Sequence, residues 1–250
     1  MKIQLTVFDV AGYLAHFRKY FSTASSLTYS FPPRTTIAGM IAGILGYERD
    51  SYYELFSSEK CRIALKLMEP VRRITHTVNY LMTDKPLTIK KLRGIGPSAQ
   101  VHMEVLISGD HSLSELRYRI FFNHDDSSVQ EAVARRIAEE KFYYPPSLGA
   151  ANFIADVTYI DTVYGEVFKP EGEIDVCTVI PTSIIKSLNP LEGTKIYLEE
   201  LVPADFTSNR LLSRKETYIY EGSGRRIRVC IEGEAFICSL SGEKIIGVFM

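Results

Sequence analysis

Two consecutive prolines near the start of the chain constrain its local structure more than any other feature. Because Pro33 follows Pro32, the backbone of Phe31 and Pro32 is held in extended geometry, and no helix runs through them. A helix is therefore predicted to begin after Pro33, with Thr35 or Thr36 as its N-cap. The apolar residues that follow have the spacing of one helix face: Ile37, Met40, Ile41, Ile44 and Leu45.

Three glycines give this predicted helix its other properties. Gly39 and Gly43 are four positions apart, so they share one face and permit a close approach to the helix backbone. We expect that face to pack on a sheet. Gly46 is predicted to end the helix.

The start of the helix has the composition of an anion site. Arg34, Thr35 and Thr36 stand where free backbone N–H groups and the positive end of the helix dipole favour a phosphate. A buried helix with an ordinary cap explains the same three residues, so the sequence alone leaves both interpretations open.

Composition excludes several classes of function. The chain has 250 residues, enough for one large domain or a domain with a smaller companion, and its net charge of −1 means that any basic surface must be local. Its four cysteines have no CxxC spacing, which argues against zinc and fits buried thiols in a reducing cytoplasm. Because no apolar leader follows Lys2 and no apolar run could span a membrane, we expect a cytoplasmic protein without a membrane partner. We also expect no metal and no cofactor.

Hydrophobic periodicity predicts an ordered series of elements. In the first two thirds of the chain, alternating apolar residues predict strands and 3.6-residue periodicity predicts helices. Ser127 or Ser128 is expected to cap the helix at residues 129–141. The predicted strands cover residues 2–10, 61–68, 117–122 and 153–160, while residues 101–107 alternate only weakly. The helices follow Pro33 and cover residues 49–58 and 129–141. The main order, β-α-β-β-α-β, is that of a ferredoxin-like α+β fold, an antiparallel sheet with helices on one face. This unit is predicted to span residues 1–165.

The remaining part, residues 166–250, is predicted to be a β-rich region. Its strand candidates cover residues 174–180, 195–201, 216–220, 226–232 and 235–239. The turn at residues 221–226, which ends on Arg225 and Arg226, is expected to be the tip of a hairpin.

Two local patterns are candidates for nucleic-acid binding. From Arg62 to Arg93 the chain has eight Lys or Arg residues against two acids, and residues 85–97 within it are predicted to form a hairpin or a long insertion. A projecting cationic loop grips a phosphate backbone because each neutralised phosphate releases counterions; a merely solvated loop is the alternative. The segment 15–21 mixes aromatic residues with Arg18 and Lys19, which fits base stacking and phosphate contact or, equally, a helix edge with solvated charges.

Three of these segments together resemble the Cas five family of CRISPR-associated proteins, within the RAMP superfamily. They are Phe17-Arg18 after the first strand, the run Tyr-Ser-Phe-Pro-Pro-Arg-Thr-Thr-Ile-Ala-Gly-Met at residues 29–40 with Gly46, and Tyr-Pro-Pro-Ser-Leu-Gly at residues 144–149. The similarity covers about residues 1–160. It implies an RRM-like ferredoxin fold and a subunit of a type I CRISPR surveillance complex (Cascade).

In that family the subunit holds the 5′ handle of the guide RNA (crRNA), caps the backbone subunits and contacts the large subunit, while target DNA is reached indirectly. A projecting β-hairpin thumb folds over the guide, and residues 70–97 are where this chain is expected to provide it. The resemblance turns the cationic and helix-start residues into candidate RNA contacts: Arg18, Lys19, Arg34, Thr35, Thr36, Lys85, Lys90, Lys91 and Arg93.

One branch of the family cleaves precursor guide RNA without metal by acid-base activation of a 2′-OH, which needs a base, an acid and a cation close together. This chain lacks the Lys-His pair expected of that branch, and only His76 and His102 lie near the basic window. No His or carboxylate spacing presents metal ligands together. The sequence therefore predicts a non-catalytic guide-RNA-binding subunit. The alternatives are a metal-independent endoribonuclease that uses His76 or His102, and a protein-interaction module without an RNA role.

Overall fold

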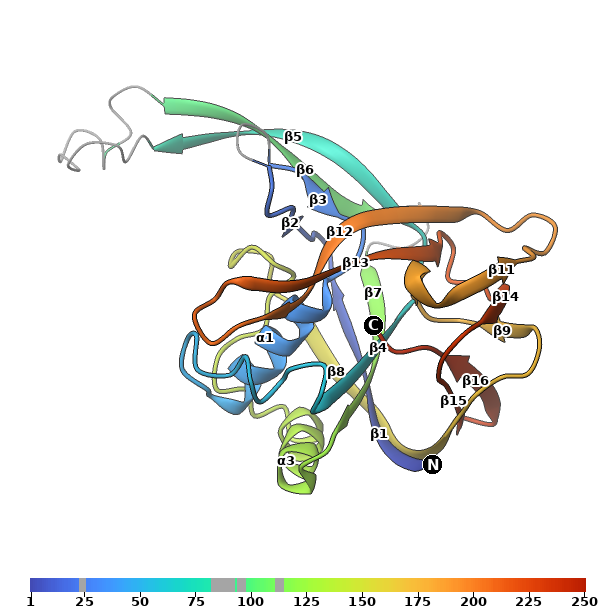
Figure 1. The fold of residues 1–250 in the computed structure, drawn as a ribbon. Helices are drawn as coiled ribbons and strands as arrows, with labels where there is room; N and C mark the ends of the chain where they lie inside the picture. The colour runs from blue at the N-terminus through green and yellow to red at the C-terminus, as the bar shows by residue number, and fades with distance from the viewer. Residues whose placement is uncertain (23–25, 82–92, 94–97, 111–114) are drawn as a thin grey trace.

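The centre of the fold is a six-stranded antiparallel sheet with the strand order β16-β15-β8-β1-β7-β4 (Figure 1). The structure is a computed structural model, and it describes residues 1–22, 26–81, 93, 98–110 and 115–250. The strands of this sheet are β1 (Lys2–Gly12), β4 (Cys61–Leu67), β7 (Leu116–His124), β8 (Asp156–Phe168), β15 (Ala235–Leu240) and β16 (Glu243–Gly247).

Two helices, α1 (Arg34–Leu45) and α3 (Ser127–Ala138), cover one face of this sheet. Their buried side chains, such as Ile41 and Val133, share a hydrophobic core with Phe8 of β1 and Phe122 of β7. A second core lies on the opposite face, where Leu5 of β1 and Phe121 of β7 pack with Phe236 of β15. The sheet is therefore buried on both faces.

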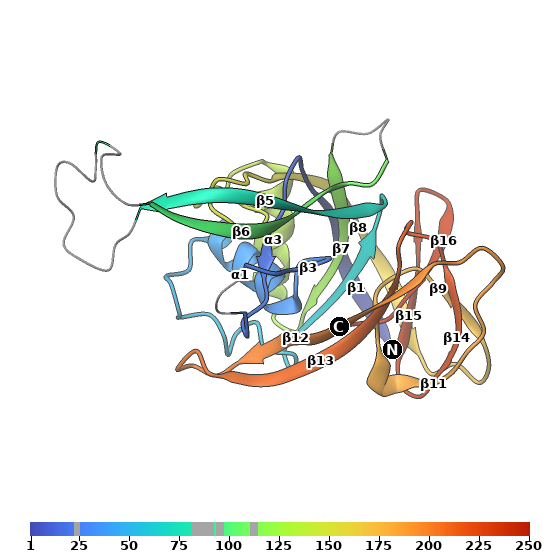
Figure 2. The same ribbon diagram turned by 90° about the horizontal axis from the view of Figure 1, so that it is seen from above.

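A two-stranded ribbon formed by β5 (Val71–Leu81) and β6 (Ser98–Ser108) projects from this body, as Figures 1 and 2 show. We call this ribbon the arm. Isolated bridges of Ala15 with Leu106 and of Ser26 with Met103 join the base of β6 to the N-terminal segment. The short strands β2 (Phe17–Arg18) and β3 (Thr28–Tyr29) pair beside it. The base of the arm is thus attached to the body through main-chain hydrogen bonds.

The chain after β8 forms two further three-stranded sheets, with the orders β10-β13-β12 and β11-β14-β9. Their strands are β9 (Ile174–Val176), β10 (Ile180–Pro181), β11 (Ile185–Leu188), β12 (Ile196–Phe206), β13 (Leu212–Glu221) and β14 (Ile227–Ile231), with a 3-10 helix, η1 (Thr182–Ile184), before β11. The next strand, β15, then pairs with β8. The C-terminal strands therefore belong partly to the sheet that the N-terminal half begins.

The coarse expectation of a β-rich α+β fold with an antiparallel sheet and few helices is confirmed. Two local predictions are wrong. Residues 49–58 form turns instead of a helix, because Asp50 has a left-handed backbone with φ 64°. Residues 221–226 are not a hairpin tip, because β13 and β14 lie in different sheets; there the Glu221 carboxylate accepts the N–H groups of Ser223 and Arg225.

The helix after the two prolines differs from its prediction at its start and on its glycine face. Helix α1 begins at Arg34 with Pro33 as its N-cap and without a side-chain cap, so neither Thr35 nor Thr36 is the N-cap. Its end at Gly46, with φ 89° and hydrogen bonds back to residues 42 and 43, is confirmed.

The glycine face of α1 was expected to pack on the sheet, and that prediction is also wrong. A Cβ on Gly39 would meet the Tyr52 hydroxyl at 2.8 Å, and one on Gly43 would meet Tyr144 at 3.9 Å. The small residues therefore accommodate tyrosines from the neighbouring loops, while the isoleucines of α1 fill the core against the sheet.

Candidate nucleic-acid interface

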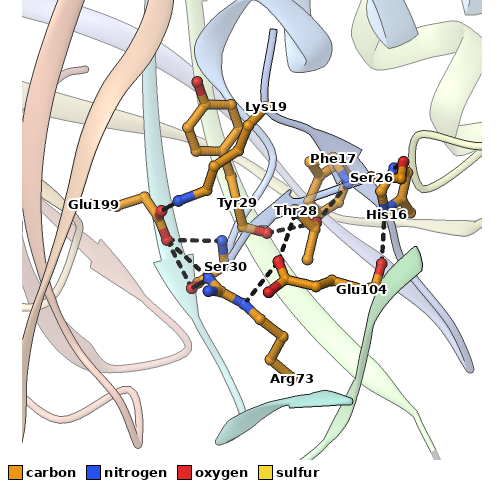
Figure 3. A network of polar contacts seen from close by, with 10 residues as sticks. All are labelled: His16, Phe17, Lys19, Ser26, Thr28, Tyr29, Ser30, Arg73, Glu104 and Glu199. Carbon is orange, nitrogen blue, oxygen red and sulfur yellow. Dashed lines mark hydrogen bonds and ion pairs between the residues drawn. The ribbon is translucent and has the colours of Figure 1, made fainter. Parts of the chain in front are cut away.

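A buried carboxylate, Glu199 of β12, lies where the arm, the N-terminal segment and β12 meet (Figure 3). Its Oε2 atom accepts the backbone N–H of Ser30 at 3.0 Å and the Ser30 hydroxyl at 2.8 Å. Lys19 forms an ion pair with Oε1, and Arg73 of the arm lies 3.4 Å from Oε2. The Glu199 side chain is only 4% exposed, so water does not solvate its charge. The two cations compensate that charge, and Ser30 satisfies its oxygen with hydrogen bonds.

An irregularity of β12 directs Glu199 inward. The register with β13 shifts between Glu199 and Val202, and Leu201 has a φ of 55°. The hydroxyl of Tyr29 donates a 2.6 Å hydrogen bond to the Leu201 carbonyl, and burial raises the pKa of Tyr29, which keeps this donor protonated. The hydrogen bond from Tyr29 of β3 therefore holds the bulge of β12, and this bulge fixes the position of the Glu199 carboxylate.

A second carboxylate, Glu104 of β6, connects the arm to β3. It accepts the backbone N–H of Thr28 at 2.9 Å and lies 3.7 Å from Arg73. The Glu104 carbonyl accepts a 2.7 Å hydrogen bond from Nδ1 of His16, whose Nε2 lies 2.9 Å from the Ser26 hydroxyl. Burial lowers the pKa of His16, which favours a neutral imidazole, and its Nε2 can then accept the Ser26 hydroxyl.

Arg73 is the residue that joins the two carboxylates. It lies on β5 at the base of the arm and reaches Glu104, Glu199 and the Ser30 hydroxyl, the last at 3.0 Å (Figure 3). These contacts add side-chain cross-links to the main-chain bridges of β6. The arm is therefore fixed at its base by both kinds of contact.

A cleft of about 630 Å³ opens beside this network, between the base of the arm and the β12–β13 pair. Its walls carry Arg72 of β5, Lys195 before β12, and Tyr197 and Tyr220 of the β12–β13 pair. In the described part of the chain, the side chains of Arg72 and Lys195 pair with no carboxylate, whereas Lys19 and Arg73 at the floor are already paired. The cleft therefore offers cationic and aromatic groups together.

The structure places two of the expected RNA contacts, Arg18 and Lys19, beside the base of the arm. Arg18 is exposed on β2 and donates a hydrogen bond of 3.2 Å to the Ser22 carbonyl. Lys19 is half-buried in the network around Glu199. Arg93 is exposed in a turn. The expected contacts Lys85, Lys90 and Lys91 lie outside the described residues.

The expectation for Arg34 needs a correction. Arg34 is 1% exposed, and its guanidinium donates to four protein acceptors: Ala204 O at 3.2 Å, Asp205 Oδ1 at 2.9 Å, Phe56 O at 3.0 Å and Cys61 O at 2.6 Å. These bonds tie α1 to β12 and to the start of β4. A guanidinium occupied in this way has no surface to offer a phosphate. Its neighbours Thr35 and Thr36 are half-buried in the first turn of the helix.

The two candidate catalytic histidines do not face one site. In the arm, His76 is paired with Met103 and the next position, Thr77, is paired with His102. Because successive residues of a strand point to opposite faces, His76 and His102 lie on opposite faces of the ribbon. His102 Nδ1 lies 3.2 Å from the Thr77 hydroxyl.

Two classes of site are not seen in the described residues. Among them, no group of three His, Cys, Asp or Glu side chains could hold a metal ion. No helix within the same residues has the length and apolar character that crossing a membrane requires.

Sequence reasoning missed most of the network and the cleft. Arg72 and Arg73 belong to the basic window, but nothing singled them out from its other cations. Glu199 lies in a strand pattern as one acid among several, and Lys195 and Tyr197 carry no local signal. These residues become recognisable as members of the network and the cleft only when the fold shows which side chains lie beside them.

The sequence matches the family model described as CRISPR-associated protein (Cas_Cas5) over residues 6–197. The fold is similar to the crystal structure of a CRISPR protein from Archaeoglobus fulgidus, with a TM-score of 0.56 and 16% identity over 98% of this chain and 99% of that chain. A chain of a CRISPR RNA-guided surveillance complex aligns over 90% of this chain and 91% of that chain, with a TM-score of 0.47 and 11% identity. No curated protein matches the sequence.

Proposed function

The chain belongs to the CRISPR-associated Cas five family, and on that premise we propose that it is a non-catalytic subunit of a type I CRISPR surveillance complex. In this proposal it binds the 5′ handle of the guide RNA and caps the backbone of the complex. Its protein partners are the backbone subunit and the large subunit. Target DNA is recognised through pairing with the guide and not by this chain directly.

One observation carries the RNA-binding part of the proposal: a ribbon projects from the body (Figure 2), and the base of this ribbon carries two cations of the basic window, Arg72 and Arg73. Arg72 and Arg73 lie at the base of the arm, and Arg93 lies in the exposed turn beyond β5. Arg18 and Lys19 lie beside that base. A protein of near-zero net charge thereby gathers four described cations at and beside the base of a projecting element, where they can neutralise phosphates of a bound strand.

The described part of the arm supports the same function through its polar face. Arg73, Thr75, Thr77 and Asn79 alternate along β5 and therefore point to one face of the ribbon. Their partners across the ribbon on that face include Glu104, His102 and Gln100. Hydroxyl, amide and imidazole groups bond to phosphates, to the 2′-OH and to base edges of single-stranded RNA.

We further infer that the N-terminal part, residues 1–165, is a ferredoxin-like unit with the arm inserted near residues 70–97, followed by a β-rich region at residues 166–250. The strand order β8-β1-β7-β4, with α1 after the first of these strands in sequence and α3 after the third, supports this inference. The β8–β15 pairing links the two parts.

The placement of the histidines supports a binding role over a catalytic one. Acid-base cleavage of RNA needs its proton-transfer groups on one side of the scissile phosphate. His76 and His102 lie on opposite faces of the arm, so they cannot act as a pair on one phosphate.

The test uses the complex that assembles when the chain is co-expressed with the other subunits of its effector and a guide-RNA precursor. Changing Lys90, Lys91 and Arg93 together to Ala should weaken retention of labelled guide RNA and lower the slope of log affinity against log salt by about 2, because each contact with a single strand contributes about 0.7. The matched control changes the exposed cations Lys169, Lys186 and Lys215 to Ala and should match the wild type.

Two results would contradict the proposal. Wild-type complex that holds no guide RNA in a salt-sensitive manner rules out the RNA-binding role. Specific cleavage of precursor RNA by the purified chain in EDTA, abolished by His76→Ala or His102→Ala, would instead establish the metal-independent endoribonuclease. Binding that is lost when the handle sequence is scrambled, but kept when the rest of the guide is changed, is the result expected for a handle-binding subunit.

A further inference from the structure

We propose that the cleft between the arm and the β12–β13 pair, which we call the arm cleft, takes one nucleotide of the bound RNA. Its phosphate is held by Arg72 and Lys195, and its base stacks on Tyr197. This inference rests on the proposed RNA-binding function and assigns to it a site that the sequence did not indicate.

The size of the arm cleft suits a single nucleotide. Its volume of about 630 Å³ lies within the range of about 300–1,000 Å³ that is typical of small-ligand sites. Its walls come from segments far apart in the chain: Pro70 to Arg73 before and within β5, and Lys195 before β12 with Tyr197 to Glu199 of β12. Since the network around Glu199 fixes both walls, the arm cleft is formed before a ligand arrives.

The charges of the arm cleft favour an anion. Arg72 and Lys195 are exposed, and among the described residues their side chains form no ion pair. Glu199, the one acid among the described residues of the lining, is 4% exposed and already accepts hydrogen bonds from Lys19, Arg73 and Ser30, so it presents no free carboxylate to the cleft. The remaining positive charge is available to a phosphate.

Tyr197 supplies the aromatic surface. Its ring stacks on Tyr220 with centroids 5.5 Å apart and planes at 24°, and 49% of the residue is exposed. Gly222 lies directly beside the ring, where an added Cβ would overlap its edge. A tyrosine supported by a second ring and a glycine, but still half exposed, is a ready platform for a base.

The combination of groups selects a nucleotide over other anions. Inorganic phosphate would use the two cations but would leave the Tyr197 ring unoccupied. An acidic peptide would also use the cations, but it lacks the planar ring that stacks on a tyrosine. A nucleotide within an RNA strand fills both parts of the cleft.

The experiment measures salt-dependent dissociation of labelled guide RNA from the assembled complex. Tyr197→Ala should weaken binding about tenfold, while Tyr197→Phe, which keeps the ring, should bind as the wild type does. The double variant Arg72→Ala with Lys195→Ala should lower the salt slope by about 1.4. Controls are Tyr164→Ala, an exposed tyrosine of β8 that does not line the cleft, and Lys169→Ala with Lys215→Ala. Ultraviolet cross-linking of the wild-type complex should place an RNA adduct on Tyr197.

The outcomes separate this inference from the proposed function. If the wild type holds RNA and the triple variant of Lys90, Lys91 and Arg93 weakens it, but Tyr197→Ala and the cationic double variant leave affinity and salt slope unchanged, the cleft proposal is overturned and the proposed function stands. If the wild-type complex holds no RNA, the cleft proposal and the proposed RNA-binding function are both overturned. Equal losses in Tyr197→Ala and Tyr197→Phe would overturn the stacking role, because the ring would then not be what the RNA contacts.

Discussion

Glu199 and Ser30 are 169 positions apart in the sequence, yet one carboxylate oxygen accepts both the backbone N–H and the hydroxyl of Ser30. Ser30 lies three positions before the second proline, so this pairing fixes the chain just before α1 begins. Because the same carboxylate also binds Lys19 and Arg73, it determines where the arm is attached relative to the N-terminal segment.

Replacing Glu199 with Ala should therefore destabilise the protein strongly. Removing one member of a buried ionic network leaves its partners uncompensated and costs about 3–5 kcal/mol. Urea unfolding measures this loss. The neighbouring exposed acid gives the control, since Glu200→Ala should change the free energy of unfolding by no more than about 0.5 kcal/mol. Equal stability of the two variants would contradict the role given to the network.

Arg34 should behave as a structural residue. Arg34→Ala is expected to cost about 3–5 kcal/mol, because it leaves the Asp205 carboxylate, 12% exposed, and the buried Phe56 and Cys61 carbonyls without their donor. Arg34→Lys should recover only part of the loss, since an ammonium lacks the planar fork of donors. Arg49→Ala, at an arginine whose side chain is 79% exposed, should be nearly neutral. A stable Arg34→Ala protein with weakened RNA binding would restore the phosphate contact expected from the sequence.

Gly149, in the Pro-Ser-Leu-Gly segment, should not accept a side chain. Its φ is 94°, and a Cβ there would overlap the carbonyl oxygen of His16. Gly149→Ala should cost about 2 kcal/mol or more, because backbone strain and the clash add. Gly172→Ala is the matched substitution at a glycine with no atom within 4 Å of the added Cβ, and its thermal midpoint should stay close to that of the wild type.

The stability of the protein should fall as the pH drops below about 6.5. Burial lowers the pKa of His16 from its ordinary value of 6.5, so the unfolded chain takes up a proton in this range that the folded chain does not. The contribution is fully present above pH 6.5 and is lost as the pH falls toward the lowered pKa. Urea unfolding of wild type and His16→Asn at pH 7.5 and 5.5 isolates it: the stability difference between the two proteins should shrink at the lower pH. A constant difference would contradict this assignment.

Local patterns in the sequence predicted several of the elements. Strands β1 and β4 contain alternating apolar and polar residues, although both faces of β1 are buried after its first residues, and α3 has an apolar stripe with Val133 at its centre, so each was recognised from its own residues. The turns at residues 49–58 have a helix-like composition, but the left-handed backbone of Asp50 decides their structure.

The candidate site was less predictable because its members meet only in the fold. Arg34 has the charge and position of a phosphate ligand, and its burial becomes visible only when Asp205, 171 positions later, is placed against it. Glu199 is directed inward by a bulge, which breaks the alternation that a strand pattern relies on. Polar contacts between residues far apart in the sequence produce no periodic pattern in the sequence, so they cannot be predicted from it in this way.

The pairing of β15 with β8 also has a consequence for how the protein is made. Strand β8 is flanked by β1, which leaves the ribosome first, and by β15, which follows about 70 residues after β8 ends. Until residues 235–240 emerge, the outer edge of β8 carries unpaired N–H and C=O groups. Nascent chains of this protein therefore pass through an interval in which they are open to edge-to-edge aggregation, and chaperone capture is most valuable to them during that interval.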